Sequence, residues 1–209
     1  AHTAGIYSRA YLMHEAGIPL EEVEWVQSGL NKGGIAEHVE LALPSTVQIT
    51  PVSDKSLDQM LINGEIDALM SSAAPKSFID GNPDIVRLYP NFEDVESAHY
   101  RKTGIFPIMH TIAIKREITE QNPWMAKNLF TAFEAAKNRS TARMRDVTIS
   151  RYPNPWNFVG AERARALFGE DIWPYGIEPN RKTLETFLQF CLEQGIAHRP
   201  VTVEELFAP

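Results

Sequence analysis

The sequence predicts an α/β protein. Short runs rich in β-branched residues alternate with stretches whose apolar residues recur at helical spacing, and hairpin signals between the runs are sparse. This alternation favours a largely parallel sheet flanked by helices, because parallel neighbours need a crossover connection between them. In such sheets, ligand sites lie beyond the carboxyl ends of the strands.

Five stretches have apolar residues at helical spacing and are predicted to be helices. In chain order they are 8–16, 57–63, the stretch from Asn122 to Ala136, 161–168 and 181–194. Asn122 and Pro123 offer an N-cap and a first-turn residue for the third helix. A glycine follows each of the other four and is expected to end it in the left-handed conformation. These glycines are Gly17, Gly64, Gly169 and Gly195.

Five short runs rich in β-branched and apolar residues are predicted to be strands. They are 23–26, 47–50, 66–70, 85–89 and 108–114, and the last is the longest of them. The glycine-rich stretch 28–34 and the polar stretch that follows it are predicted to be irregular. The Pro- and Trp-rich stretches 151–158 and 171–180 are expected to be loops.

Composition excludes several classes of protein. Among 209 residues, 20 Lys and Arg stand against 27 Asp and Glu, which gives a net charge of −7. This charge argues against a nucleic-acid partner. No stretch reaches the roughly 18 consecutive apolar residues that a transmembrane helix needs, so no membrane span is predicted. Cys191 is the only cysteine, which rules out an intrachain disulfide, and we expect it to act as a small apolar residue on a helix face.

Common catalytic motifs are missing from the sequence. There is no GxGxxG, GK[ST] loop, HExxH or GxSxG, so the glycines of 28–34 are interpreted as a loop and not as a phosphate site. His38 and Glu40 lie two residues apart, which supplies too few ligands for a metal, and no metal site is predicted. The chain begins at Ala1 without a methionine or a leader, so we expect a removed leader or absent upstream sequence.

The segment 98–110 holds the densest set of polar side chains. His99, Tyr100, Arg101, Lys102, Thr103 and His110 lie on both sides of a turn with a glycine and a proline. Two interpretations stay open from these residues alone. One is a site for an anionic ligand, and the other is a connector whose charges are solvated and whose His110 is an ordinary strand histidine.

Three segments resemble one known family. They are VESAHYRKTGIFPIMHTIAI (95–114), NGEIDALMSSAAPKSF (63–78), and the C-terminal IWPYGIEPNRKTLETFLQFCLEQGI with VEELFAP. Together they are similar to the 4,5-dihydroxyphthalate decarboxylase family. The similarity is most specific at TGIFPIMH and WPYGIEPNRKTLE. It is weaker where the family more often has an arginine before proline and this chain has Ala73 and Ala74.

The resemblance implies a fold. The family's fold is similar to type II periplasmic binding proteins, with two α/β lobes and the ligand in the cleft between them. On this basis residues 1–88 would form the second-lobe α/β domain. Residues 89–209 would supply the crossover strand and the C-terminal helical part of the first lobe, whose N-terminal part would be absent from these residues.

The resemblance also implies an activity, the decarboxylation of 4,5-dihydroxyphthalate to protocatechuate, or of a related aromatic acid, without a cofactor. A small aromatic carboxylate would be the partner, an oligomer is compatible with the sequence, and the location would be cytoplasmic. The reaction needs a proton donor near neutral pH, and His110 is the first candidate and His99 the second.

Further residues are candidates for holding the substrate. Arg101 would clamp a carboxylate through paired N–H donors, and Tyr100 and Thr103 would bond phenolic oxygens. Arg9 is a further candidate anion contact, and His38 is held in reserve. Two aromatic residues of the Pro-rich loop, Trp173 and Tyr175, would either wall an aromatic pocket or act as packing anchors.

The main alternative is a different class of protein. The same fold closes over ligands without chemistry, so a solute-binding protein of an ABC transporter for a small aromatic or sulfonated anion stays open. A signal peptide in the absent upstream sequence would favour this alternative and a periplasmic location. A ligand-sensing domain of a regulator is a third class.

Overall fold

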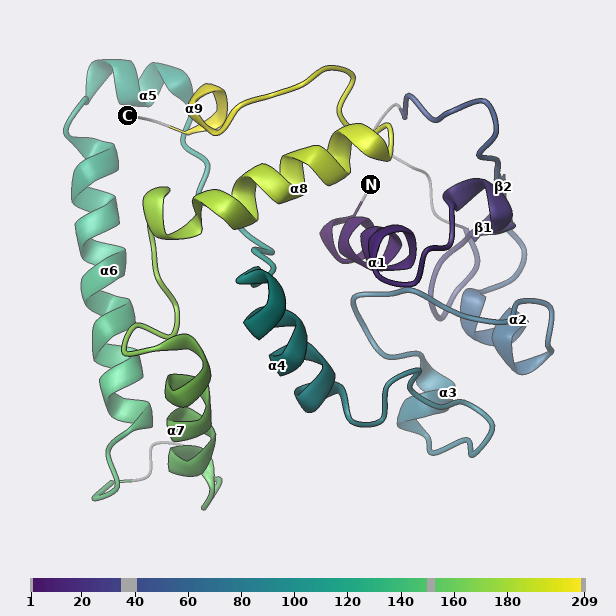
Figure 1. Cartoon of the computed structure of the whole chain (residues 1–209), viewed down its shortest axis with the longest axis horizontal. Coiled ribbons are helices and arrows are strands. Elements are labelled where there is room, and N and C mark those ends of the chain that lie inside the picture. Colours follow the sequence, from purple (N-terminus) through teal and green to yellow (C-terminus); the bar gives the residue numbers. More distant parts are fainter. Residues whose placement is uncertain (1, 35–40, 150–152, 208–209) are drawn as a thin grey trace. The chain divides into compact units, whose positions relative to one another are not determined.

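The computed structural model describes residues 2–34, 41–149 and 153–207 (Figure 1). Its elements, in chain order, are α1 (Thr3–His14), η1 (Leu20–Glu22), β1 (Trp25–Gln27), β2 (Ile49–Pro51), α2 (Leu57–Ile62), α3 (Lys76–Ile79), α4 (Phe92–Thr103), α5 (Arg116–Gln121), α6 (Met125–Met144), α7 (Asn157–Phe168), η2 (Glu178–Asn180), α8 (Arg181–Glu193) and α9 (Val203–Leu206). The described chain is therefore mixed, mostly helical with a small sheet, which agrees with the predicted α/β class at this level.

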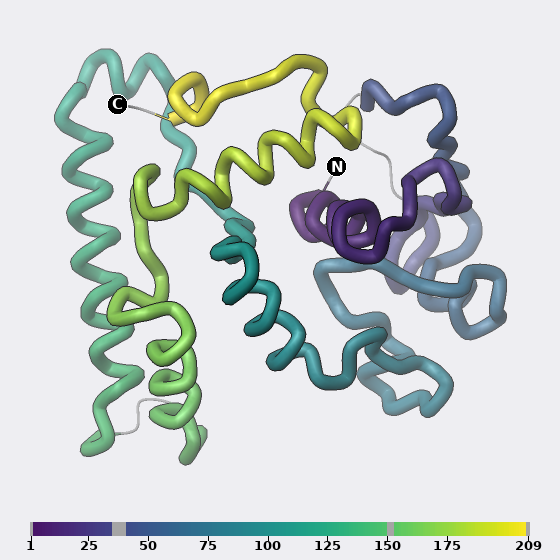
Figure 2. The backbone as a smooth tube through the Cα atoms, viewed as in Figure 1, coloured from purple at the N-terminus to yellow at the C-terminus, as the bar shows by residue number. Residues whose placement is uncertain are grey.

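The chain divides into two compact units. Unit 1 comprises Ala1–Val95 and Glu185–Glu205, and unit 2 comprises Glu96–Leu184 and Leu206–Pro209. Figure 2 shows that unit 1 takes in both early, purple segments and late, yellow ones. Each unit is thus built from parts of the chain that are distant in sequence.

In unit 1 the two strands pair in parallel, as the sequence predicted, with Trp25 opposite Ile49. One face of helix α1 is buried. On it, the ring of Tyr7 lies 5.3 Å from the ring of Phe187 and 6.1 Å from the ring of Phe190, both on α8. Cys191 is buried among the apolar residues of this core, as expected. The other buried apolar residues of unit 1 are Ile6, Ala10, Leu20, Val47, Met60 and Val203.

The five predicted helices are confirmed, with shifted ends: α1 runs from Thr3 to His14, α6 extends to Met144, and α7 begins at Asn157. Positive φ angles of 66°, 68°, 93° and 65° at Gly17, Gly64, Gly169 and Gly195 confirm the four predicted glycine stops. Helix α6 begins at Met125 with Trp124 as its N-cap, and not at Asn122. The reason is local, because the Asn122 amide instead donates to the Ile118 carbonyl at 3.2 Å and so closes the end of α5.

Three of the five strand predictions are wrong. The stretches 66–70, 85–89 and 108–114 have no regular structure. Val86, Leu88 and Ile112 leave 75%, 81% and 66% of their surface exposed. A run of β-branched residues becomes a strand only against a neighbouring backbone, and none pairs with these runs within the described residues.

Helix α4 was not predicted as a helix. Its first turn holds Glu93 and Asp94, and its last turn holds Arg101 and Lys102. This arrangement suits the helix dipole, whose positive end lies at the N-terminus. Residues up to Thr103 are therefore helical, and the charged side chains of Arg101 and Lys102 are exposed, as the connector interpretation of 98–110 expects.

In unit 2, α6 and α7 lie side by side, as Figure 1 shows. Arg145, the C-cap of α6, and Arg165 on α7 share the carboxylates of Glu162 and Glu170 at 2.7 to 3.7 Å. Within the ranges the structure describes, no helix combines the length and the apolar character needed to cross a bilayer.

Candidate functional site

The last turn of α4 positions four of the residues selected from the sequence, His99, Tyr100, Arg101 and Thr103. The Thr103 hydroxyl donates to the His99 carbonyl at 2.8 Å and accepts the Ile105 N–H at 3.1 Å. Thr103 thus closes the helix end, and its hydroxyl is already engaged by the backbone. His99 is half-buried on the same turn.

Arg101 is an exposed cation at this helix end. A helix C-terminus carries partial negative charge, which repels an anion unless basic side chains offset it. Arg101 and Lys102 provide that offset. A guanidinium in this position can hold a carboxylate from solvent through two parallel N–H bonds.

A chain of edge-to-face aromatic contacts leads from α4 to the loop after α7. The Tyr100 ring lies 4.6 Å from that of Phe168. Phe106 lies 5.1 Å from Phe168 and 5.2 Å from Trp173. Tyr100 and Trp173, which the sequence singled out separately, therefore belong to one aromatic cluster in unit 2.

This cluster forms part of the wall of a hollow of about 530 Å³. Its lining residues are Phe106, Phe133, Ala136, Lys137, Ser140, Thr141, Met144, Ala164, Phe168, Ile172, Trp173 and Tyr175. Both aromatic residues that the sequence suggested as pocket walls, Trp173 and Tyr175, are in this list. The hollow lies wholly within unit 2, between α6, α7 and the loop after α7.

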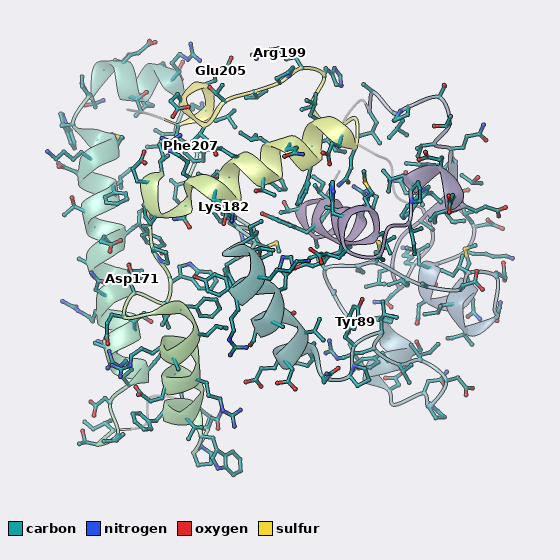
Figure 3. The ribbon with its side chains drawn as sticks, viewed as in Figure 1. Tyr89, Asp171, Lys182, Arg199, Glu205 and Phe207 are labelled. Carbon is teal, nitrogen blue, oxygen red and sulfur yellow. The ribbon has the colours of Figure 1, made fainter. Side chains whose placement is uncertain are left out.

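Lys137 is the charged residue of the hollow, and only 5% of its side chain is exposed. Its ammonium donates to Glu134 at 2.8 Å and to Asp171 at 2.7 Å, and it lies 5.2 Å from the centre of the Tyr175 ring. Asp171 reaches it from the loop that follows α7 (Figure 3). Burial acts to lower the pKa of Lys137, but the hydrogen bonds that its ammonium donates to Asp171 and Glu134, together with their negative charges, outweigh it, so the pKa is raised.

The candidate proton donor lies away from these contacts. His110 is in the irregular segment after α4, is exposed, and forms no hydrogen bond or ion pair with the described part of the chain. Its imidazole is therefore not committed to a structural role. The structure does not bring it into contact with Arg101 or with the lining of the hollow.

Arg9 lies in unit 1, on α1. Its Nε donates to the Gln194 side chain at 2.8 Å, and the Gln194 amide donates in turn to the Ile6 carbonyl at 2.8 Å. Arg9 therefore has a structural role whatever else it binds. The last candidate, His38, lies outside the described residues.

No three His, Cys, Asp or Glu side chains gather to hold a metal within residues 2–34, 41–149 and 153–207. Sequence reasoning missed Lys137 and Ser140. A signal was present, because both fall on the helical stripe set by Phe130, Phe133 and Ala136, where a lysine is unusual.

Comparison with known proteins gives two relatives, and no family model matches the chain. A Comamonas testosteroni protein named 4,5-dihydroxyphthalate decarboxylase is 29% identical over 208 residues, which is 99% of this chain and 63% of that protein. A Pseudomonas putida protein of the same name is 32% identical over 100 residues, or 47% of this chain and 39% of that protein. The chain thus spans less than two thirds of the length of each relative. The resemblance that three sequence segments indicated is confirmed, because the chain is similar to two proteins named 4,5-dihydroxyphthalate decarboxylase.

Proposed function

We propose that the protein to which these residues belong is a carboxy-lyase that decarboxylates 4,5-dihydroxyphthalate or a related aromatic acid without a cofactor. The observation that carries this proposal is the similarity over 208 residues to a protein of that name. The two-lobed fold of periplasmic binding proteins, with residues 1–88 and 89–209 in its two parts, and a cytoplasmic location belong to the same proposal. A chain that divides into two compact units supports a two-lobed fold, with a division close to residue 88 but with Glu185–Glu205 in the first unit.

The chemistry requires one proton and no redox change. A ring hydroxyl para to the departing carboxylate feeds electrons into the ring, and a proton adds to the carbon that bears this carboxylate. The bond to the carboxylate then breaks, CO₂ leaves, and the bonding electrons return to the ring. The protein must supply the proton at working pH and hold the substrate in place.

We assign the proton to His110, with His99 as the second candidate. An exposed imidazole without a structural partner supports His110, since its ring is available to a substrate. His99 is half-buried in α4 and close to Arg101 along the chain. Arg101 would hold the carboxylate that stays on the ring, with Tyr100, Thr103, Arg9 and His38 as further candidate contacts.

The test uses the full-length protein with 4,5-dihydroxyphthalate, and it follows CO₂ release and the aromatic absorbance. We expect turnover that falls about 10²-fold or more in His110→Ala, the loss expected for a general acid. Thr111→Ala, an exposed neighbour in the same segment, is the matched control and should keep its activity. Turnover unchanged in His110→Ala but lost in His99→Ala would move the proton to His99.

A second pair of variants tests the carboxylate clamp. Arg101→Ala should raise KM for the substrate by about tenfold or more, because a charge-assisted pair is lost. Arg101→Lys keeps the charge but not the paired geometry, so it should recover only part of that loss. Saturable binding without CO₂ release would refute the enzyme and favour a solute-binding protein.

A further inference from the structure

We propose that the hollow lined by α6, α7 and the loop after α7 is a binding site for a small, neutral phenol. This site is separate from the carboxylate site proposed around Arg101 and His110, and it does not depend on it. Three observations carry the inference: the size and lining of the hollow, the charges next to it, and an exposed hydroxyl group, that of Ser140, on its lining.

Size and lining fit a single aromatic ring. The volume of about 530 Å³ lies within the range of roughly 300–1,000 Å³ that small-molecule sites occupy. The rings of Phe106, Phe168 and Trp173 already meet edge to face at 5.1 and 5.2 Å. A further ring can join them in the same geometry, which aromatic groups prefer over face-to-face stacking.

The charges next to the hollow select against an anion: Lys137 lines the hollow, and the two carboxylates that flank Lys137 lie behind the lining. One ammonium, that of Lys137, is bonded to two carboxylates, Glu134 and Asp171, so the group carries one excess negative charge. The Glu134 Oε2 atom is buried and has no hydrogen-bond partner among the described residues. A carboxylate placed beside this group would meet two like charges in a partly desolvated site. A ligand without charge avoids that repulsion.

A hydroxyl on the ring would find partners. Ser140 lines the hollow, and its side chain forms no hydrogen bond to the described residues. The Lys137 ammonium has three N–H bonds, of which Glu134 and Asp171 take two. A phenol can donate to the Ser140 hydroxyl and accept from the third N–H, which an apolar ring cannot do.

The test compares two ligands that share a ring and differ in charge, phenol and benzoate, by calorimetric titration of the intact protein at pH 7. We expect saturable phenol binding in the millimolar range and benzoate binding weaker by about tenfold or more. Equal affinities, or no saturable phenol binding, would overturn the proposal. No turnover is measured, so a protein that decarboxylates but does not bind phenol would refute this inference alone.

Variants locate the site. Ala164→Leu should fill the hollow and abolish phenol binding, whereas Ala166→Leu, on the exposed side of the same helix, should preserve it. Asp171→Asn removes one negative charge with little change in shape, so it should strengthen benzoate binding at least threefold and leave phenol within twofold. If Ala164→Leu does not fold, the Asp171→Asn result decides. Phenol binding that survives in folded Ala164→Leu, or a benzoate affinity unchanged in Asp171→Asn, would contradict the assignment.

Discussion

Gln194 should be one of the most sensitive polar positions of unit 1. It is only 2% exposed, and it links two parts of the chain by accepting from Arg9 and donating to the Ile6 carbonyl, both at 2.8 Å. Gln194→Ala removes both bonds at once. It removes one donor from the buried Ile6 carbonyl and one acceptor from the half-buried Arg9 guanidinium.

The magnitude follows from the two bonds. The amide-to-carbonyl bond contributes about 1 kcal/mol, and the bond from the charged Arg9 contributes about 1.5–3 kcal/mol. The expected loss in the free energy of unfolding is therefore about 2.5–4 kcal/mol. Gln194→Glu still accepts from Arg9 but cannot donate to Ile6, and it places a carboxylate oxygen against the Ile6 carbonyl, so it should also be destabilising.

The assay is urea unfolding followed by circular dichroism, with the midpoint and slope fitted for each variant. Gln189→Ala is the matched control, because Gln189 lies on α8, which ends one residue before Gln194, is exposed, and bonds to the exposed side of the helix through Glu193 at 2.7 Å. We expect the control to lie within about 0.5 kcal/mol of the parent. If Gln194→Ala and Gln189→Ala lose the same amount, the buried bridge does not stabilise the unit and the reasoning is wrong.

Three further predictions concern backbone, charge and thiol. Gly195→Ala should be far more destabilising than Gly17→Ala. Both positions have a positive φ, which costs a residue with a side chain about 1–2 kcal/mol. At Gly195 the new Cβ would in addition lie 2.3 Å from the Ala42 carbonyl oxygen, whereas at Gly17 it would meet nothing within 4 Å. Thermal unfolding of the pair checks this, and equal melting temperatures would contradict it. Because the pKa of Lys137 is raised in the folded protein, its contribution to stability is complete below the ordinary lysine pKa of about 10.4 and is lost as pH rises through the folded-state value. Lys137→Met should therefore lose less stability than the parent between pH 9 and pH 11.5 in urea unfolding, and parallel curves would argue against this. Burial raises the pKa of the Cys191 thiol, although the charge of Arg9 partly opposes it, so alkylation by iodoacetamide at pH 8 should be on the order of tenfold or more slower than after denaturation. Equal rates would show that this core opens readily.

The helices could be predicted because their signals are local. A glycine with positive φ ends a helix within one turn of the residues that form it, as at Gly64 and Gly169. The strands could not be predicted to the same degree. The runs 85–89 and 108–114 have strand composition, but a strand also needs a partner backbone, which composition does not reveal.

The candidate site, too, has features that the sequence predicted and features that it did not. Tyr100, Trp173 and Tyr175 were selected from composition, and the structure places all three in or beside one aromatic cluster. Lys137 was missed because its two carboxylate partners include Asp171, which lies 34 residues further along the chain. The roles of His110 and Arg101 stay proposals that the kinetic variants address.

By itself, the sequence determined the helix stops, the parallel pairing of its first two strands, the burial of Cys191 and the resemblance to decarboxylases, because each depends on neighbouring residues or on composition. Only the tertiary structure decided that Arg9 is bonded to Gln194, 185 residues away, and that Lys137 lies with five aromatic rings around one hollow. Contacts of this kind form when distant segments pack together. The free energy gained by burying these side chains depends on residues far away in the sequence, which a local sequence pattern does not identify.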